Sequence, residues 1–253
     1  MWSGRTAYGR NGRAFADGDV AVTWLAGVDG CRAGWIIGLV RPAGDEVTIR
    51  VVPHFAAVLA APEAPAIIAV DMPIGLPDRI GAGGRGPEVL VRRMLPGRAS
   101  SVFSVPSRAA IYENDYAGAC RIALATSDPP RALSRQLFNI MPRIREVDIA
   151  LRADPAAQAR VFESHPELAF CRMNGGLPPP PKKTPDGAAA RRALLAAVGL
   201  VAPDQAPRGA AVDDMLDALA CATVARRLYD GTASSHPDRP GRDTHGLPIA
   251  IWT

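Results

Sequence analysis

Two aspartates directly follow apolar runs of the sequence. Asp29 comes after the run 22–28, and Asp71 comes after the run 66–70. If both runs are neighbouring strands, their ends bring two carboxylates together, and like charges at short range raise each other's pKa unless a cation neutralises them. Mg²⁺ and Mn²⁺ prefer such oxygen ligands. The pattern predicts a divalent-metal site, although each Asp taken alone is also typical of a turn or a helix cap.

Further acids lie early in the Ala- and Leu-rich segment 210–229, which is predicted to be a helix. Asp214 and Asp217 are spaced i, i+3, and Asp213 and Asp217 are spaced i, i+4, so all three can share one face. The apolar residues that follow indicate close packing on a sheet. We therefore expect Asp217, with Asp214 or Asp213, to face the same cleft. The alternative is a solvated acidic first turn that suits the helix dipole.

Glu163 resembles Asp29 and Asp71 in placement, because it follows the strand-like stretch 160–162. We count it among the candidate catalytic residues. His165 is a candidate ligand, proton carrier or substrate contact, or a turn residue beside Pro166. Hydrolysis by a Ser–His–acid set is a weaker interpretation, since the sequence has no Gly-x-Ser-x-Gly nucleophile elbow.

Two segments combine basic and hydroxyl side chains, as phosphate binding requires. They are 97–108, which reads GRASSVFSVPSR, and 182–184, which reads KKT. The alternative for both is a solvated loop. The candidate substrate contacts in them are Arg98, Ser100, Ser101, Arg108 and Lys182.

The apolar patterns predict elements in the order strand, strand, strand, helix, strand, followed by a long helical segment. Residues 79–155 are predicted to be a helical insertion, because they are too many for a bare loop. A short strand, two helices and a loop-like tail with an edge strand follow. The predicted strands are 22–28, 34–40, 46–52, 66–70, 160–162 and 247–252; the predicted helices are 55–60, 88–95, 115–125, 134–138, 144–151, 184–200 and 210–229.

The bulk composition is that of one globular domain, 23–253, preceded by an extension, 1–22, that we expect to be disordered. The net charge of +4 allows an anionic partner without requiring one. The four cysteines form no Cys-x-x-Cys pair and are expected to be reduced, as in a cytoplasmic protein. No apolar run predicts a membrane span or a signal peptide. The oligomeric state is not indicated.

The combination of segments in this chain resembles the uncharacterised domain family numbered DUF 429, from about Gly27 to Trp252. Members of that family are usually described as predicted RNase H-like nucleases. The resemblance implies an α/β fold with a mixed five-stranded sheet, flanked by helices and carrying a helical insertion. The segments that carry it are GVDGCRAGW (27–35), VDMPIGL (70–76), GRASSVFSVPSR (97–108), LSRQ (133–136), ESHPE (163–167), KKT (182–184) and DDMLDALA (213–220).

The wider RNase H-like superfamily carries acids on its first and fourth strands and on a C-terminal helix. Asp29, Asp71, Asp214 and Asp217 look like those positions, and DMLDALA (214–220) looks like the helix of the Holliday-junction resolvases. The resemblance implies two Mg²⁺ or Mn²⁺ ions, with Asp29 bridging both, that cleave a phosphodiester of a nucleic acid or another phosphoester substrate. Glu163 has no assigned counterpart.

Two other functions remain open from the sequence. Actin-like ATPases and sugar kinases share the same core, so an ATP-dependent phosphotransferase is one alternative. A nucleic-acid or nucleotide binder without catalysis is the other, although clustered acids do not favour binding to phosphates.

Overall fold

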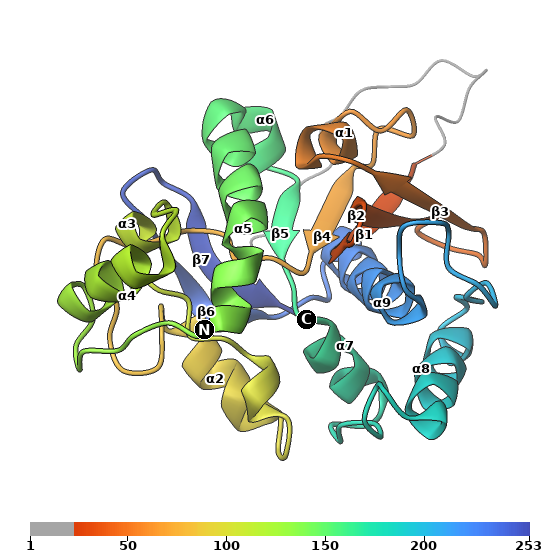
Figure 1. Ribbon diagram of the computed structural model, residues 1–253. Helices are drawn as coiled ribbons and strands as arrows, with labels where there is room; N and C mark the ends of the chain where they lie inside the picture. Colours follow the sequence, from red (N-terminus) through yellow and green to blue (C-terminus); the bar gives the residue numbers. More distant parts are fainter. Residues whose placement is uncertain (1–22) are drawn as a thin grey trace, which may run out of the picture.

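A computed structural model describes residues 23–253, so the expected extension, 1–22, lies outside the described residues. The described chain is an α/β structure built on a five-stranded sheet of order β3-β2-β1-β4-β5, beside a two-stranded hairpin, β6-β7 (Figure 1). The strands of the larger sheet are β1 Leu25–Cys31, β2 Gly34–Val40, β3 Val47–Val52, β4 Ile67–Val70 and β5 Val161–Glu163. The predicted mixed five-stranded α/β fold is confirmed.

The direction of each strand follows from its connections. Short turns join β1, β2 and β3, which pair antiparallel. Longer crossovers bring β4 beside β1 and β5 beside β4, and both of these pairs are parallel. Strand β2 is buried along nearly its whole length, because helices cover both faces of the sheet.

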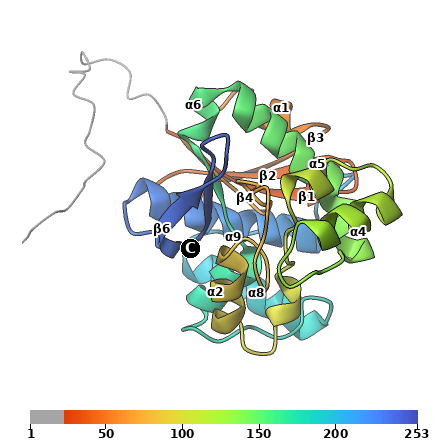
Figure 2. The ribbon, with the colours of Figure 1, turned by 90° about the vertical axis from the view of Figure 1, so that its left-hand side faces the viewer.

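The sheet lies between two helical layers (Figure 2). On one face, α1 (Phe55–Leu59) and α5 (Arg135–Ala153) share a core with Trp35 and Ile144. Glu146 fastens this layer, since its Oε2 accepts hydrogen bonds from Trp35 Nε1 at 2.8 Å and from the Phe55 amide at 2.9 Å. On the other face lies α9 (Val212–Tyr229), with α7 (Pro166–Met173) and α8 (Pro185–Ala197) beside it.

Helix α9 approaches β1 so closely that only glycine fits at position 27. A Cβ on Gly27 would lie 2.0 Å from the Ala218 carbonyl oxygen and 2.1 Å from the Ala222 amide nitrogen. We expect Gly27→Ala to lower the free energy of unfolding by about 3 kcal/mol, the upper end of the usual cost of overpacking, because the backbone of the helix must shift. Urea denaturation checks this, with Gly241→Ala as the control, since a Cβ at Gly241 would have no neighbouring atom within 4 Å. A Gly27→Ala variant as stable as the control would contradict this packing.

The segment between β4 and β5 is helical, as predicted, but its longest helix differs from the prediction. The patches 134–138 and 144–151 belong to one helix, α5, which contains Pro142. Buried residues such as Met141 and Ile144 pack this helix onto the sheet, so it is part of the core. The other elements of the segment are α2 Pro87–Met94, the 3₁₀ turn η1 Ala99–Ser101, α3 Arg108–Ile111 and α4 Tyr116–Ala125, and α6 Pro155–Gln158 follows α5.

The tail is more regular than its sequence suggests. Residues from 231 onward were expected to be mostly loop, yet β6 (Ser235–Arg242) pairs antiparallel with β7 (Pro248–Trp252). Strand β6 contains two prolines and a glycine and has no apolar alternation, so no strand pattern is visible in it. The hairpin adjoins the main sheet through a bridge between Ser164 and Trp252.

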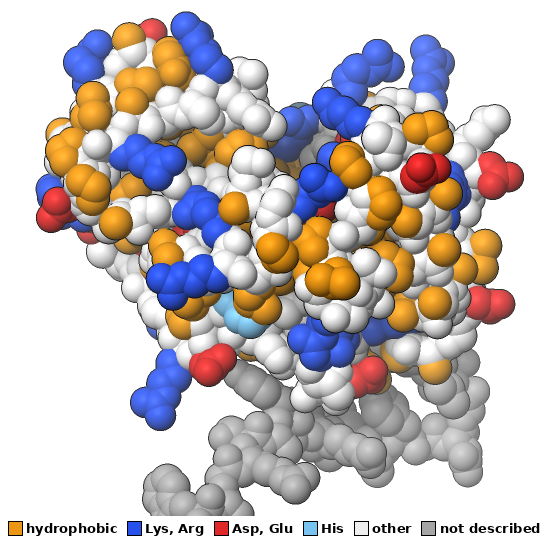
Figure 3. All heavy atoms as spheres, turned by 90° about the horizontal axis from the view of Figure 1, so that it is seen from below, with side chains coloured by type: hydrophobic (Ala, Val, Ile, Leu, Met, Phe, Trp, Pro, Cys, Tyr) orange, Lys and Arg blue, Asp and Glu red, His pale blue; other side chains and the backbone are white. Residues whose placement is uncertain are grey.

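The surface carries many basic side chains. Figure 3 looks onto the face over α2, α7 and α8, where Lys and Arg side chains are spread across the middle and most acidic ones lie near the margin. Within residues 23–253, no helix has both the length and the apolar character that crossing a membrane requires.

Candidate active site

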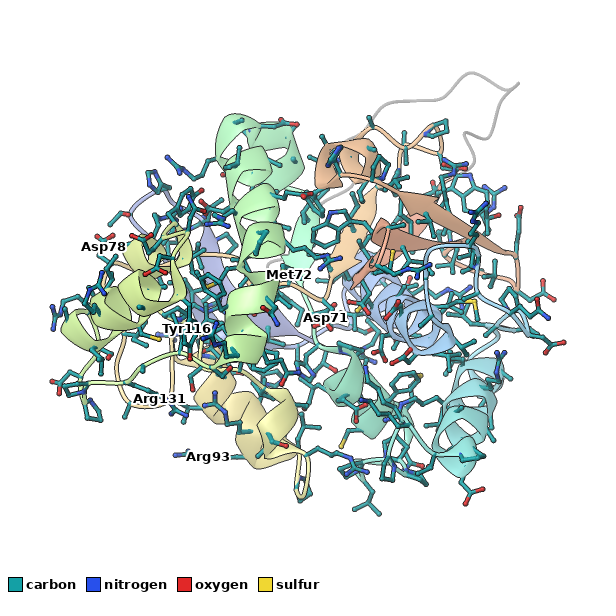
Figure 4. The ribbon with its side chains drawn as sticks, in the orientation of Figure 1. Asp71, Met72, Asp78, Arg93, Tyr116 and Arg131 are labelled. Carbon is teal, nitrogen blue, oxygen red and sulfur yellow. The ribbon has the colours of Figure 1, made fainter. Side chains whose placement is uncertain are left out.

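The two strand aspartates lie side by side because β1 and β4 are parallel neighbours. Val28 pairs with Val70, and the Asp71 amide donates to the Val28 carbonyl at 2.9 Å. The next residue on each strand is therefore Asp29 or Asp71. Strand β1 continues to Cys31, so Asp29 lies within the strand and not just beyond its end as predicted. Figure 4 shows Asp71 in the middle of the molecule, between the ribbons of α5 and α9.

Helix α9 brings the third acid. Asp217 is 2% exposed and is buried where the helix crosses β1 and β4. Asp214 caps the same helix, since its Oδ2 accepts the Ala211 amide at 2.9 Å. The charge of Asp214 acts on Asp29, whereas the side chain of Asp213 is 39% exposed and lies near Lys182. Of the two alternatives left by the sequence, Asp214 is the one whose charge acts on Asp29.

Burial, and for Asp29 and Asp217 also neighbouring acids of the site, raises the pKa values of these carboxylates. Burial raises the pKa of Asp29 well above its usual value, and the charges of Asp71, Asp217 and Asp214 raise it further. Burial raises the pKa of Asp71 to about 7, against the opposing charge of Lys182. Burial likewise raises the pKa of Asp217 to about 6, although Lys182 lowers it. The site holds more negative charge than its own cations neutralise.

Lys182 contacts the acids and so lies at the site, as a candidate substrate contact should. Its Nζ donates to Asp217 Oδ2 at 2.7 Å and lies 3.9 Å from Asp213 Oδ2. The pKa of Lys182 is raised, because the charge of Asp217 outweighs the effect of burial. In this structure the ammonium therefore neutralises a carboxylate.

The donor set suits a hard divalent cation, although the ligands are not yet assembled around one point. Among residues 23–253, no group of three or more His, Cys, Asp or Glu side chains is arranged to hold a metal ion. Asp217 Oδ1, however, is buried without a hydrogen-bond partner among the described residues. Asp29 Oδ1 accepts the amide of the adjacent Gly30, at 2.7 Å. Three carboxylates from three elements, one of them with a buried oxygen that lacks a partner, supply the oxygen ligands that Mg²⁺ or Mn²⁺ prefers, so we judge that the residues fit such an ion.

Glu163 lies beside the acids but is already engaged. It pairs with Val70 across β4 and β5. Arg85 Nη2 donates to its Oε1 at 2.6 Å, and the Ile74 amide donates to its Oε2 at 2.7 Å. Burial still raises the pKa of Glu163 to about 7, against the charge of Arg85. These contacts suit a residue that positions the loop after β4 better than a metal ligand.

Arg85 is a residue that the sequence did not point to. Its side chain is fully buried between Glu88 and Glu163, and it also donates to the Ile74 carbonyl at 2.7 Å. It sits in the glycine-rich stretch GAGGRGP (81–87), which resembles any exposed loop. Only the contacts between distant segments reveal its role.

The other predicted substrate contacts divide into two groups. His165 and Ser101 line a cavity of about 190 Å³ that Asp29 and Asp71 also line, and His165 Nε2 is 3.3 Å from the Ser101 carbonyl. Burial lowers the pKa of His165, which favours the neutral ring. Ser100 lines a separate cavity with Arg131 and Ser134.

The two predicted arginines make structural contacts. Arg98 Nη2 donates to the Pro179 carbonyl at 3.3 Å. Arg108 forms ion pairs with Asp148 and Asp243, and it does not line the cavity at the acids. For Arg108 this geometry supports a role in holding α3, α5 and the hairpin together instead of contact with a phosphate.

Arg143 is a further basic residue at the site that sequence reasoning missed. It lies on α5, lines the cavity with Asp29, and donates to the backbone carbonyls of Cys31 and Gly34. Gly30 makes room for it, because a Cβ at Gly30 would lie 2.7 Å from Arg143 Cδ. In sequence, the Asp-Gly pair 29–30 is typical of a turn. In the structure, Gly30 leaves space for the side chain of Arg143 next to Asp29.

The raised pKa values predict how stability depends on pH. Between the ordinary value of 3.8 and the folded value of about 7 for Asp71, the folded chain binds more protons than the unfolded chain. We therefore expect the free energy of unfolding of the metal-free protein to fall as pH rises through this window. Urea denaturation at several pH values measures this. Asp71→Asn should flatten the slope, and a slope unchanged by that substitution would contradict the assignment.

The comparisons agree with the resemblance seen in the sequence. A family model described as "Protein of unknown function (DUF429)" matches residues 27–242. Neither a curated protein nor a solved structure gives a significant match to the chain. The matched residues include the strand acids, Arg85, Arg143 and Asp217, so the whole candidate site lies inside the match. Because the match covers most of the sequence, the chain belongs to the DUF429 family.

Proposed function

We propose that this protein is a divalent-cation-dependent phosphodiester hydrolase that acts on nucleic acid and uses an RNase H-like fold. The observation that carries the proposal is the meeting of Asp29, Asp71 and Asp217 from β1, β4 and α9, with raised pKa values and an unpartnered buried oxygen on Asp217. The 3-2-1-4-5 sheet with an antiparallel β1-β2-β3 half is compatible with that fold.

Some residues of the site would bind the cation, and others would contact the substrate. Asp29, Asp71 and Asp217 would hold the cation through their carboxylates, with Asp214 as an additional acid at the start of α9. A bound Mg²⁺ or Mn²⁺ would offset their charge and activate water at neutral pH. Such an ion also explains why a protein would keep buried carboxylates that repel one another.

The cavity beside the acids supplies the surroundings that a phosphodiester needs. Arg143 brings a guanidinium group to this cavity, and the apolar side chains of Val102, Phe103 and Ile140 line it as well. Excluding water strengthens the attraction between a phosphate and the arginine. The basic surface around α2, α7 and α8 fits a polyanionic substrate (Figure 3).

A cleavage assay tests this proposal. End-labelled single-stranded DNA, duplex DNA, RNA, RNA–DNA hybrid and a four-way junction are incubated with Mn²⁺, with Mg²⁺ or with a chelator. We expect cleavage of at least one of these substrates with metal and none with chelator. Cleavage of none of them would contradict the proposal, and turnover of ATP instead would support the phosphotransferase alternative.

Two variants on one helix give a matched comparison. Losing a residue that only supports a metal ligand lowers activity by roughly 10–100-fold. Asp217→Asn removes a proposed ligand itself, so it should reduce cleavage by more than that. Asp213→Asn, four residues earlier and 39% exposed, should keep activity within a fewfold of the native protein. Equal losses in both variants would contradict the assignment of Asp217.

A further inference from the structure

Lys182 is held in place more firmly than a surface lysine normally is. The residue before it, Pro181, accepts hydrogen bonds from the Thr184 amide at 3.0 Å and from Thr184 Oγ1 at 2.8 Å. Arg191, which is 1% exposed, donates to the Pro180 carbonyl at 2.7 Å. The backbone that carries Lys182 is thus fixed by the first turns of α8.

A close backbone contact adds to this support. A Cβ on Gly187 would lie 1.9 Å from the Pro181 carbonyl oxygen, so the helix and the proline segment touch directly. Gly187 also donates its amide to Thr184 Oγ1 at 3.1 Å, which caps α8. Because the backbone is held on both sides of Lys182, its side chain contacts Asp217 from a fixed position.

Lys182 divides the two oxygens of Asp217 between different partners. Oδ2 accepts a hydrogen bond from the Lys182 ammonium at 2.7 Å, whereas Oδ1 is buried and has no hydrogen-bond partner within residues 23–253. Two metal ions would need more oxygen ligands from these acids than one ion does. A carboxylate would have to bind through both of its oxygens or bridge the two ions. With Oδ2 taken by Lys182, the site has ligands for fewer ions than the resemblance to two-ion nucleases implies.

We propose that Lys182 Nζ takes the place of one of the two cations, so that the site binds a single divalent ion through Asp29, Asp71 and Oδ1 of Asp217. The inference rests on the proposed function, because it concerns the metal content of that same site. In this assignment the Lys182 ammonium supplies one of the positive charges of the site and positions Asp217. This role replaces the phosphate contact that was predicted from the sequence.

Counting bound Mn²⁺ tests this directly. The full chain is titrated with Mn²⁺, and the free ion is followed by electron paramagnetic resonance. We expect one bound ion per chain for the native protein and two for Lys182→Met, which keeps the aliphatic stem but frees Asp217 Oδ2. Lys182→Arg, which keeps the charge, and Lys183→Met, which removes a neighbouring exposed charge, should each bind one. Circular dichroism checks that all variants are folded.

Each outcome has a separate meaning. Two ions in the native protein, or one ion in both the native protein and Lys182→Met, would overturn the inference while leaving a metal-dependent hydrolase intact. One ion in the native protein and two in Lys182→Met, without cleavage of any nucleic acid, would support the inference and contradict the proposed function. The absence of bound Mn²⁺ from every variant would overturn both.

Discussion

Replacing Asp29 with Asn should abolish metal-dependent cleavage and at the same time make the metal-free protein more stable. The substitution removes one of three charges that repel each other, while the amide oxygen can still accept the Gly30 amide, as Asp29 Oδ1 does at 2.7 Å. Relief of such functional strain is commonly worth about 0.5–2 kcal/mol. Urea denaturation at pH 7.5 in the presence of a chelator measures the gain.

The two effects of Asp29→Asn must appear together for the interpretation to hold. Adding Mn²⁺ should stabilise the native protein and should stabilise the Asn variant much less, because binding to the folded state alone raises stability by mass action. Asp186→Asn, an exposed acid in the first turn of α8, serves as the control and should change neither cleavage nor stability appreciably. Unchanged cleavage by Asp29→Asn would contradict the account, as would a loss of stability in the metal-free state.

Replacing Arg85 with Met should cause a larger loss of stability than replacing any of the aspartates at the site. The substitution leaves Glu88 and Glu163 buried without their partner, and it removes the donor to the Ile74 carbonyl. Breaking a buried ion pair from one side costs about 3–5 kcal/mol. For a chain of this size, that loss corresponds to a fall in Tm of roughly 6–20 °C. Thermal denaturation followed by circular dichroism measures it.

Two further variants separate charge burial from general disruption. Glu46→Gln breaks an ion pair with Arg41 in which the glutamate is 55% exposed, and it should cost less than about 1 kcal/mol. Adding Glu163→Gln to Arg85→Met should restore part of the stability, since a neutral amide is cheaper to bury than an unpaired carboxylate. No restoration in the double variant would argue against an unpaired Glu163 as the cause of the loss.

The strands of the main sheet, and the aspartates that follow their apolar runs, were predictable because their signal is local. An apolar run followed by Asp marks β1 and β4 directly, and the parallel pairing of Val28 with Val70 then brings Asp29 and Asp71 together. Helix α9 was equally clear from its composition. The sequence did not predict which of Asp213 and Asp214 is close to Asp29. That depends on the rotation of α9 about its own axis, which is set by packing.

The site residues that sequence reasoning missed depend on contacts between distant segments. Arg85 and Glu163 are 78 positions apart, and Arg143 reaches the backbone of Cys31 from 112 positions away. An isolated arginine gives no sign of its partner in the sequence, so Arg108 looked like a phosphate contact and Arg85 like part of a loop. Lys182 was predicted as a substrate contact, and its bond to Asp217 could not be read from the order of residues.

The central claim is that Asp29, Asp71 and Asp217 together hold a divalent cation. A crystal structure of the protein soaked in Mn²⁺, with the metal located by its anomalous scattering, tests that claim most directly. We predict a peak bonded to carboxylate oxygens of all three aspartates, including Asp217 Oδ1, which now has no hydrogen-bond partner. A structure with no peak among these residues at saturating Mn²⁺, or with Mn²⁺ bound only elsewhere on the surface, would contradict the account.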